Sequence, residues 1–320
     1  LTLPQSIALT AGGGTIVLQG DRNLTFSGTG SSNSNGSNIF LNNGSGLLTL
    51  SGSFALQDTT NPRSVSFGGW GNMLMSGPIR NGGTAAGSLV KVGPGTLTLS
   101  GTNTFTGSFS LNGGMVSAAF NSAVNNQLGA ATLTLGGGSL VATKSDATTG
   151  TQTYTSTTMA ASTATAVTLT TTGGGSLSLF TGPLTRGAGA VAYFAPPASG
   201  VINFGTSSVG NWAVIQSAGS LFFAAKDGSN NLVPAVTAMR DSPALFGATE
   251  NVTDGTGFSG LANTGTVQSL RFNANTSSTL SLASGALLTL AGGGILVTPN
   301  VGAFDSAISG GTIAAGGGEL

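Results

Sequence analysis

The segment Lys91–Gly107, which reads KVGPGTLTLSGTNTFTG, limits the possible folds of this chain most strongly. Its centre, Thr96–Leu99, alternates Thr and Leu with the period of two that is typical of a strand with one buried face. Gly93–Gly95 (Gly-Pro-Gly) precedes this strand, and Ser100–Gly101 follows it, and both are turn sequences. The segment therefore predicts a short, half-buried strand between two turns.

Degenerate copies of this strand recur along the chain, at Leu47–Gly52, Leu133–Gly136, Leu177–Leu179, Leu280–Leu282 and Leu287–Gly292. Glycine triplets followed by apolar residues form a second recurring element, at Gly12–Val17, Gly136–Val141, Gly173–Leu177 and Gly292–Val297. From Leu47 to Leu177 the strand elements recur every ~35–50 residues, a spacing typical of solenoid coils with unequal loops. Between Leu179 and Leu280 no clear copy is present.

The recurring strands are too short to bury their apolar faces alone, so each coil has to stack on the next one to complete a core. Glycine supplies the positive φ angles that corners need. The sequence therefore predicts an all-β chain, a parallel β-helix or solenoid of irregular Gly-rich coils. In this fold we expect aromatic side chains to fill the core, namely Phe26, Phe40, Phe54, Phe67 and Phe105.

Lys91–Gly107 closely resembles the autotransporter-associated β-strand repeat of exported bacterial passenger regions. The segment Asn121–Gly129 (NSAVNNQLG) is similar to an insertion in the same family, and residues from Ile202 to Leu320 resemble a region found beside these repeats in large exported proteins. The resemblance implies a parallel β-solenoid outside the cell, on a bacterial surface. We expect residues 1–320 to form one continuous solenoid within a longer chain, with a repeat-rich half (1–190) and a second half (191–320).

Two segments depart from the repeated pattern. Residues 118–128 (AAFNSAVNNQL) predict a short helical turn before the next strand. Residues 142–172 are rich in Thr and Ala, and Thr favours strands or exposed loops over helix. We expect this second segment to be an irregular loop that enters a strand near Val167.

Charge is scarce and balanced, because nine basic and nine acidic residues make up only 6% of the 320 residues. Several opposite charges are neighbours in the sequence, as in Asp21-Arg22, and such pairs create no long-range field. We therefore expect no nucleic-acid partner. No polybasic cluster and no apolar run of about 18 residues is present, so the sequence predicts no membrane insertion of this segment.

The inventory of reactive side chains is small. The chain has no His and no Cys, which excludes Ser-His-Asp and Cys-His nucleophiles, thiolate metal sites and disulfides. The sequence therefore predicts no enzyme, no cofactor, no metal and no catalytic residue.

One acidic region keeps an enzymatic alternative open. A glycosidase needs two carboxyl groups about 5–10 Å apart, and the region that contains Asp227, Asp241, Glu250 and Asp254 is the densest in acids. The same acids leave calcium binding open as well. We interpret all four as solvated turn residues. Trp212 and Tyr193 could form a carbohydrate-contacting face, although burial or edge capping is the preferred interpretation.

The leading functional hypothesis is structural. We expect an extracellular solenoid that builds a surface fibre, a biofilm matrix or an adhesin stalk by head-to-tail association of identical copies, since low charge leaves little repulsion between chains. One alternative is a passenger adhesin anchored by a separate membrane barrel, with cell-surface or matrix glycans as partners. A polysaccharide-active β-helix enzyme is the other alternative.

Overall fold

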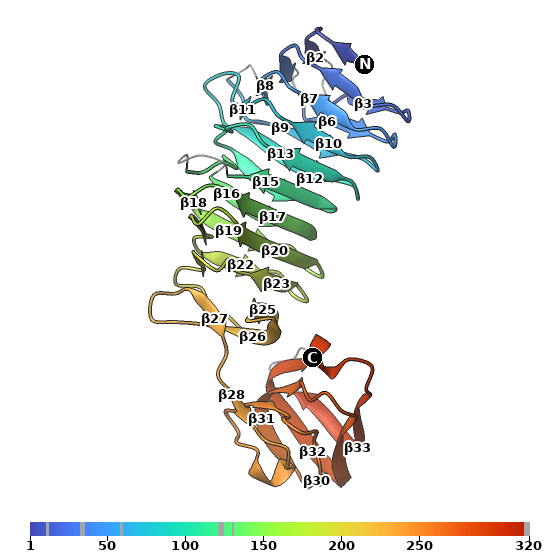
Figure 1. Ribbon diagram of the computed structural model, residues 1–320, viewed down its shortest axis with the longest axis vertical. Helices are drawn as coiled ribbons and strands as arrows, with labels where there is room; N and C mark the ends of the chain where they lie inside the picture. Colours follow the sequence, from blue (N-terminus) through green and yellow to red (C-terminus); the bar gives the residue numbers. More distant parts are fainter. Residues whose placement is uncertain (11–12, 33–35, 58–59, 121–124, 130, 317–320) are drawn as a thin grey trace. The chain divides into compact units, whose positions relative to one another are not determined.

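A computed structural model describes residues 1–10, 13–32, 36–57, 60–120, 125–129 and 131–316 (Figure 1). Among these residues the regular structure is β-strand, apart from the 3-10 helices η1 (Pro243–Leu245) and η2 (Pro299–Val301), and this confirms the all-β class. None of the described helices is long and apolar enough to cross a membrane. The chain divides into two compact units, Leu1–Ser207 and Ser208–Leu320. The single continuous solenoid stays a prediction.

The first unit is a stack of coils whose strands form three parallel faces (Figure 1). The first sheet contains β1 (Thr2–Leu3), β4 (Leu24–Phe26), β7 (Leu48–Leu50), β10 (Met73–Met75), β13 (Thr96–Leu99), β15 (Met115–Ala119), β17 (Gly138–Lys144), β20 (Ala164–Thr171) and β23 (Val191–Ala195). The second sheet contains β3 (Thr15–Leu18), β6 (Asn38–Asn42), β9 (Arg63–Gly68), β12 (Gly87–Val92), β14 (Ser108–Leu111), β16 (Thr132–Leu135), β19 (Ser156–Met159) and β22 (Leu184–Arg186). This arrangement confirms the predicted parallel β-solenoid.

The third face lies between the first and second sheets in chain order. Its early coils contribute β2 (Ile7–Leu9), β5 (Gly30–Ser32), β8 (Phe54–Ala55) and β11 (Ile79–Arg80), and its late coils contribute β18 (Thr149–Thr153), β21 (Ser176–Phe180) and β24 (Ile202–Asn203). Between these two groups the face is held by side-chain amides: Asn103 Oδ1 accepts from Ile79 N at 2.9 Å, and Gln127 Nε2 donates to Gly101 O at 2.7 Å. The amides replace the strand ladder where the backbone departs from a regular strand.

One coil is much shorter than the sequence pattern predicts. Registered partners in adjacent strands of the first sheet are 19 residues apart for Thr96 and Met115, and 27 apart for Ala164 and Val191. The interpretation of the recurrence every ~35–50 residues as the length of one coil is therefore wrong. The cause is that Leu-x-Leu pieces occupy all three faces: Leu97 lies in the first sheet, Leu133 in the second, and Leu177 in the third.

Alternation places one side chain of every pair inside the coil, where it stacks on its counterparts in neighbouring coils. One such column runs along the first sheet through Leu48, Met73, Leu97, Val116, Leu140, Val167 and Phe194. All of these side chains are at most 2% exposed. Of the Phe residues predicted to fill the core, Phe40, Phe54, Phe67 and Phe105 are buried, while Phe26 is half-buried.

The Thr-rich segment 142–172 is not a loop. It contains the end of β17, all of β18 and β19, and β20, which runs through Val167 as expected. The strand propensity of Thr prevails because stacking on adjacent coils supplies ladder partners for the whole segment. Of the predicted helical turn, residues 121–124 lie outside the described part. Before this gap Ala118 and Ala119 belong to β15. After it Gly129 N donates to Asn126 O at 2.7 Å in a turn, and Leu128 forms a β-bridge with Asn103.

The second unit begins with an antiparallel meander, β25 (Ala213–Ser217), β26 (Ser220–Lys226) and β27 (Leu232–Pro234). Parallel pairing then joins β28 (Thr237–Met239), β29 (Asn251–Thr253), β30 (Leu261–Ala262), β31 (Gly265–Phe272), β32 (Ser278–Val297) and β33 (Ser306–Ala315). The long strand β32 contains the motifs predicted at Leu280–Leu282 and Leu287–Gly292, and its Gly285 and Gly293 adopt positive φ angles.

Arg271 connects the two parts of this unit. It is only 4% exposed, and its guanidinium carbon lies 4.3 Å from the centroid of the Phe222 ring in β26. Its Nε donates to Leu221 O at 2.8 Å, and its Nη1 donates to Thr253 Oγ1 at 3.2 Å. Burial lowers the pKa of Arg271, an effect that the nearby charge of Asp254 opposes. The guanidinium thus holds the meander against the parallel sheet.

Candidate functional site

The four carboxylates singled out in the sequence all lie in the second unit, and each accepts hydrogen bonds from its surroundings. Asp227 lies in the turn between β26 and β27 and accepts from Asn231 N at 2.9 Å and Ser229 N at 2.8 Å. These hydrogen bonds, that from Asn231 first, lower the pKa of Asp227. The interpretation of Asp227 as a turn residue is confirmed.

The interpretation of all four acids as solvated is wrong for Asp254, which is buried. It is 1% exposed, and its carboxylate accepts hydrogen bonds from Asn273 N (2.5 Å), Ala274 N (2.9 Å) and Ser278 Oγ (2.7 Å). A buried carboxylate needs such donors, because desolvation without them is very costly. Asp254 therefore organises the chain between β31 and β32.

Glu250 and Asp241 brace neighbouring loops. Arg240 Nη2 lies 2.7 Å from Glu250 Oε1, and Gly247 N donates to Glu250 Oε2 at 3.1 Å. The hydrogen bond from Arg240 lowers the pKa of Glu250. Asp241 accepts from Gly255 N at 2.6 Å and from Thr256 Oγ1 at 2.8 Å; partial burial opposes these bonds, but the net effect lowers the pKa of Asp241. Among the described residues, no three His, Cys, Asp or Glu side chains gather as a metal site.

The aromatic residues considered for a carbohydrate face lie in different units, Tyr193 on β23 and Trp212 just before β25, and both are half-buried. Burial raises the pKa of Tyr193. Trp70, which no sequence pattern marks as a site residue, is 77% exposed at the corner between β9 and β10.

Two buried lysines hold corners of the coil. Lys91 stacks between Phe67 and Leu111 in the second sheet and is 0% exposed. Its Nζ donates to Val92 O (2.9 Å), Gly93 O (2.7 Å) and Gly113 O (3.2 Å), so that it bridges two successive corners. Burial lowers the pKa of Lys91 to about 8.

Lys144 has the same structural role in β17. Its Nζ lies 2.7 Å from Asp146 Oδ1 and donates to Thr148 Oγ1 at 2.7 Å and to Phe120 O at 3.1 Å. The hydrogen bond from Lys144, together with those from Thr148, lowers the pKa of Asp146 to about 2. Both lysines therefore serve the scaffold.

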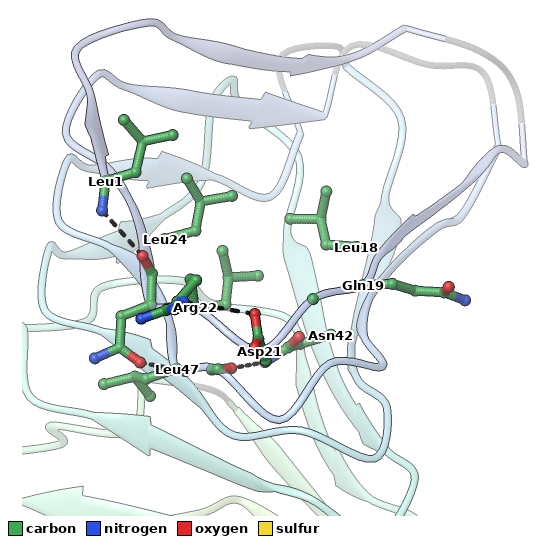
Figure 2. A pocket seen from close by; sticks show the side chains of 12 residues that line it. Leu1, Leu18, Gln19, Asp21, Arg22, Leu24, Asn42 and Leu47 are labelled. Atoms are coloured by element: carbon green, nitrogen blue, oxygen red, sulfur yellow. Dashed lines mark hydrogen bonds and ion pairs between the residues drawn. The ribbon is translucent and has the colours of Figure 1, made fainter.

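A hollow of about 230 Å³ opens at the corner where the second sheet leads into the first, in the first two coils (Figure 2). Its apolar wall includes Leu18, Leu24 and Leu47, and Asp21 and Arg22 form its polar rim. The side chains of this pair are 82% and 93% exposed, with Arg22 Nε 3.8 Å from Asp21 Oδ1. The hollow therefore combines an apolar wall with exposed polar groups.

Amide side chains fix the backbone around this hollow. Asn23 Oδ1 accepts from Leu47 N at 2.9 Å, and Asn42 Nδ2 donates to Gly46 O at 2.9 Å (Figure 2). Asn42 Nδ2 also donates to Asn72 O at 2.8 Å in the next coil. The corner is thus held in place across three successive coils.

Comparison with known proteins gives one match. Residues 89–118 match the model of the passenger-associated-transport-repeat family, and they contain the whole of β13 and β14. The search of curated proteins and the search of solved structures gave no match. The match confirms the resemblance seen at Lys91–Gly107, and such a repeat implies secretion to the cell surface. The chain is thus a parallel β-solenoid with an autotransporter passenger-type repeat.

Proposed function

We propose that this chain is a structural segment of an exported bacterial surface protein, in which stacked coils build a fibre, a matrix element or an adhesin stalk. The observation that carries the proposal is the uninterrupted column of inward side chains in the first unit, which includes the passenger-type repeat at 89–118. A solenoid of this kind gains length by adding coils.

Homotypic association is the second part of the proposal. Only 6% of residues are charged, so electrostatic repulsion between copies is weak. Strands at the end of a solenoid have one unpaired backbone edge, which favours pairing with another strand. If one end of the solenoid binds the opposite end of a second copy, each added copy leaves a free end, and the result is a filament.

The experiment is light scattering coupled to size-exclusion chromatography at rising protein concentration and low salt, followed by electron microscopy. We expect oligomers that grow with concentration and form linear particles. Ile7→Lys places a charge on the inward face of β2 and should reduce this growth, while Ala8→Lys, on the exposed face of the same strand, should leave it unchanged. A chain that stays monomeric at the highest concentration contradicts the homotypic proposal.

We also propose a structural role in preference to a catalytic one. The support is that all four candidate carboxylates bind backbone or side-chain donors that hold loops together. The test is an assay for polysaccharide cleavage by the whole chain and by variants with Ala at Asp227, Asp241, Glu250 or Asp254. A cleavage activity that disappears in a variant that still folds contradicts this proposal.

A further inference from the structure

Trp70 is the most exposed aromatic side chain among the described residues. Its exposed fraction is 77%, whereas Phe40, Phe54 and Phe67 in the same coils are at most 1% exposed. A packed Trp side chain buries more apolar area than a Phe side chain, so the exposed Trp70 contributes less to the stability of the fold than a buried Trp would. Packing of the first unit therefore gives no reason for Trp at this position.

The backbone around Trp70 explains how the ring is presented. Three successive coils turn this corner with Gly-x-Gly, namely Gly44-Ser45-Gly46, Gly69-Trp70-Gly71 and Gly93-Pro94-Gly95, and the middle residue of each is exposed. A Cβ atom on Gly71 would overlap Gly44 O, and one on Gly95 would overlap Gly71 O. The flanking glycines thus pack backbone against backbone and force the middle side chain outward.

Hydrogen bonds fix the corner further. Gly71 N donates to Asn42 O at 2.8 Å, Gly95 N donates to Gly69 O at 2.9 Å, and Trp70 N donates to Asn43 Oδ1 at 3.3 Å. The indole is therefore attached to a backbone that is already ordered, and a ligand that covers the ring would meet little loss of backbone entropy on binding.

Two exposed polar side chains, those of Asp21 and Arg22, lie at the same corner of the stack. Asn42 and Gly46, one coil away, line the hollow whose rim carries Asp21 and Arg22 (Figure 2). Strands in adjacent coils are about 4.8 Å apart, which places the rim roughly 10 Å from Trp70 along the stack. An exposed aromatic ring and an exposed carboxylate and guanidinium group thus lie at the same corner of the stack, two coils apart.

We propose that this corner binds an uncharged oligosaccharide, with one pyranose ring stacked on Trp70 and the neighbouring hydroxyls held by the polar groups toward Asp21 and Arg22. A pyranose ring has a flat face of C–H groups and an edge of hydroxyls, which matches an apolar platform beside polar side chains. A protein partner would require an apolar core around a hot spot, but the flanking residues Gly69 and Gly71 have no side chain. A membrane partner would require a basic cluster, and the net charge of the chain is zero.

The test uses the whole chain with Trp212→Phe, which leaves Trp70 as the single indole. Cellohexaose, chitohexaose and soluble dextran serve as probes, and Trp emission and its quenching by acrylamide report binding. We expect at least one saccharide to shift the emission to the blue and to protect the ring from acrylamide. In titration calorimetry on the otherwise native chain, Trp70→Ala should lower the affinity by about tenfold or more, whereas Trp70→Phe should retain part of it.

Phe304→Ala is the matched control, because Phe304 is an exposed aromatic residue (49%) of the second unit. The affinity of this variant for saccharide should equal that of the native chain. Thermal unfolding of Trp70→Ala should match that of the native chain, since the ring is exposed. Three results overturn the proposal: no probe changes the emission, Trp70→Ala binds saccharide as tightly as the native chain, or phosphatidylcholine vesicles shift the emission while saccharides do not. None of these results depends on self-association, so the structural proposal is tested separately.

Discussion

Substitution of Gly77 by Ala tests the packing that sets the distance between coils. Gly28, Gly52, Gly77 and Gly101 lie one above another in four successive coils. None of them has a positive φ angle, so the need for glycine here is purely steric. A Cβ atom on Gly77 would overlap Gly52 O and would lie 2.7 Å from Ser51 O. These are backbone atoms, which cannot rotate away as a flexible side chain would.

The cost can be worked out from the hydrogen bonds that flank the contact. To admit a methyl group, the two coils must separate by roughly 1 Å, against an interstrand spacing of about 4.8 Å. The separation would strain the bond from Ser76 N to Leu50 O (3.1 Å) and that from Phe54 N to Pro78 O (2.9 Å). Each bond contributes about 1 kcal/mol, and overpacking itself costs about 1–3 kcal/mol. We therefore expect Gly77→Ala to lower the free energy of unfolding by about 3 kcal/mol.

Thermal unfolding monitored by far-ultraviolet circular dichroism measures this loss. For a unit of this size, about 3 kcal/mol corresponds to a decrease in Tm of roughly 6–12 °C. Ser76→Ala changes the exposed neighbour and should leave Tm unaltered. At Gly228 an added Cβ atom would have no neighbouring atom within 4 Å, and the φ angle is not positive. Gly228→Ala should therefore raise the free energy of unfolding by about 0.4–1 kcal/mol. If Gly77→Ala unfolds within about 2 °C of the native chain, backbone contact between coils does not require glycine there.

Three further predictions concern buried groups. Burial lowers the pKa of Lys91 to about 8 from 10.5, so between these two pH values the unfolded chain binds more protons than the folded chain. The free energy of unfolding should therefore rise with pH across this window, by up to about 3 kcal/mol. Urea unfolding of Lys91→Met at the same pH values should show no such rise. Asp254→Ala removes the acceptor of two buried donors and one half-buried donor and should destabilise the second unit by about 3–5 kcal/mol. Calorimetry will detect this loss as an earlier transition, and an unchanged transition would contradict this role. Leu97→Ala should cost about 2–5 kcal/mol in urea unfolding, and a loss below 1 kcal/mol would indicate that the column at Leu97 is loosely packed.

The sequence predicts the strands of this fold better than it predicts their arrangement. Alternation of Leu and Thr identifies β13 correctly, because each Leu enters the core and each Thr faces outward. The same pattern carries no information about which face a strand joins, so the distance between copies does not measure the coil. Segment 149–153 is a strand that the alternation of apolar and polar residues does not predict, because its inward residues are Gly150 and Gln152. Gln152 is buried because its side-chain amide accepts a hydrogen bond from Leu128 N and donates one to Gly129 O.

The candidate site could be predicted only in part. Lys91 has the same parity as Leu89, so the alternation already places its side chain on the inward face of β12. What the sequence does not show is the set of carbonyls from two coils that receive its ammonium. Trp70 is similar: Gly-Trp-Gly is visible as a turn, but its equivalence to Gly-Pro-Gly at residues 93–95 follows only from the coil register.

The glycine corners separate the requirements of folding from those of recognition. Backbone atoms of successive coils touch at Gly44, Gly71 and Gly95, so glycine is needed at these positions. The side chain between each pair of corner glycines is exposed, and it differs from coil to coil, as Ser45, Trp70 and Pro94. A solenoid of this type can therefore change what it displays on its surface without changing the corner that displays it. Trp70 is the position where this chain uses that freedom for a large aromatic ring, and this makes the corner, more than the charged loops of the second unit, the place to look for a ligand.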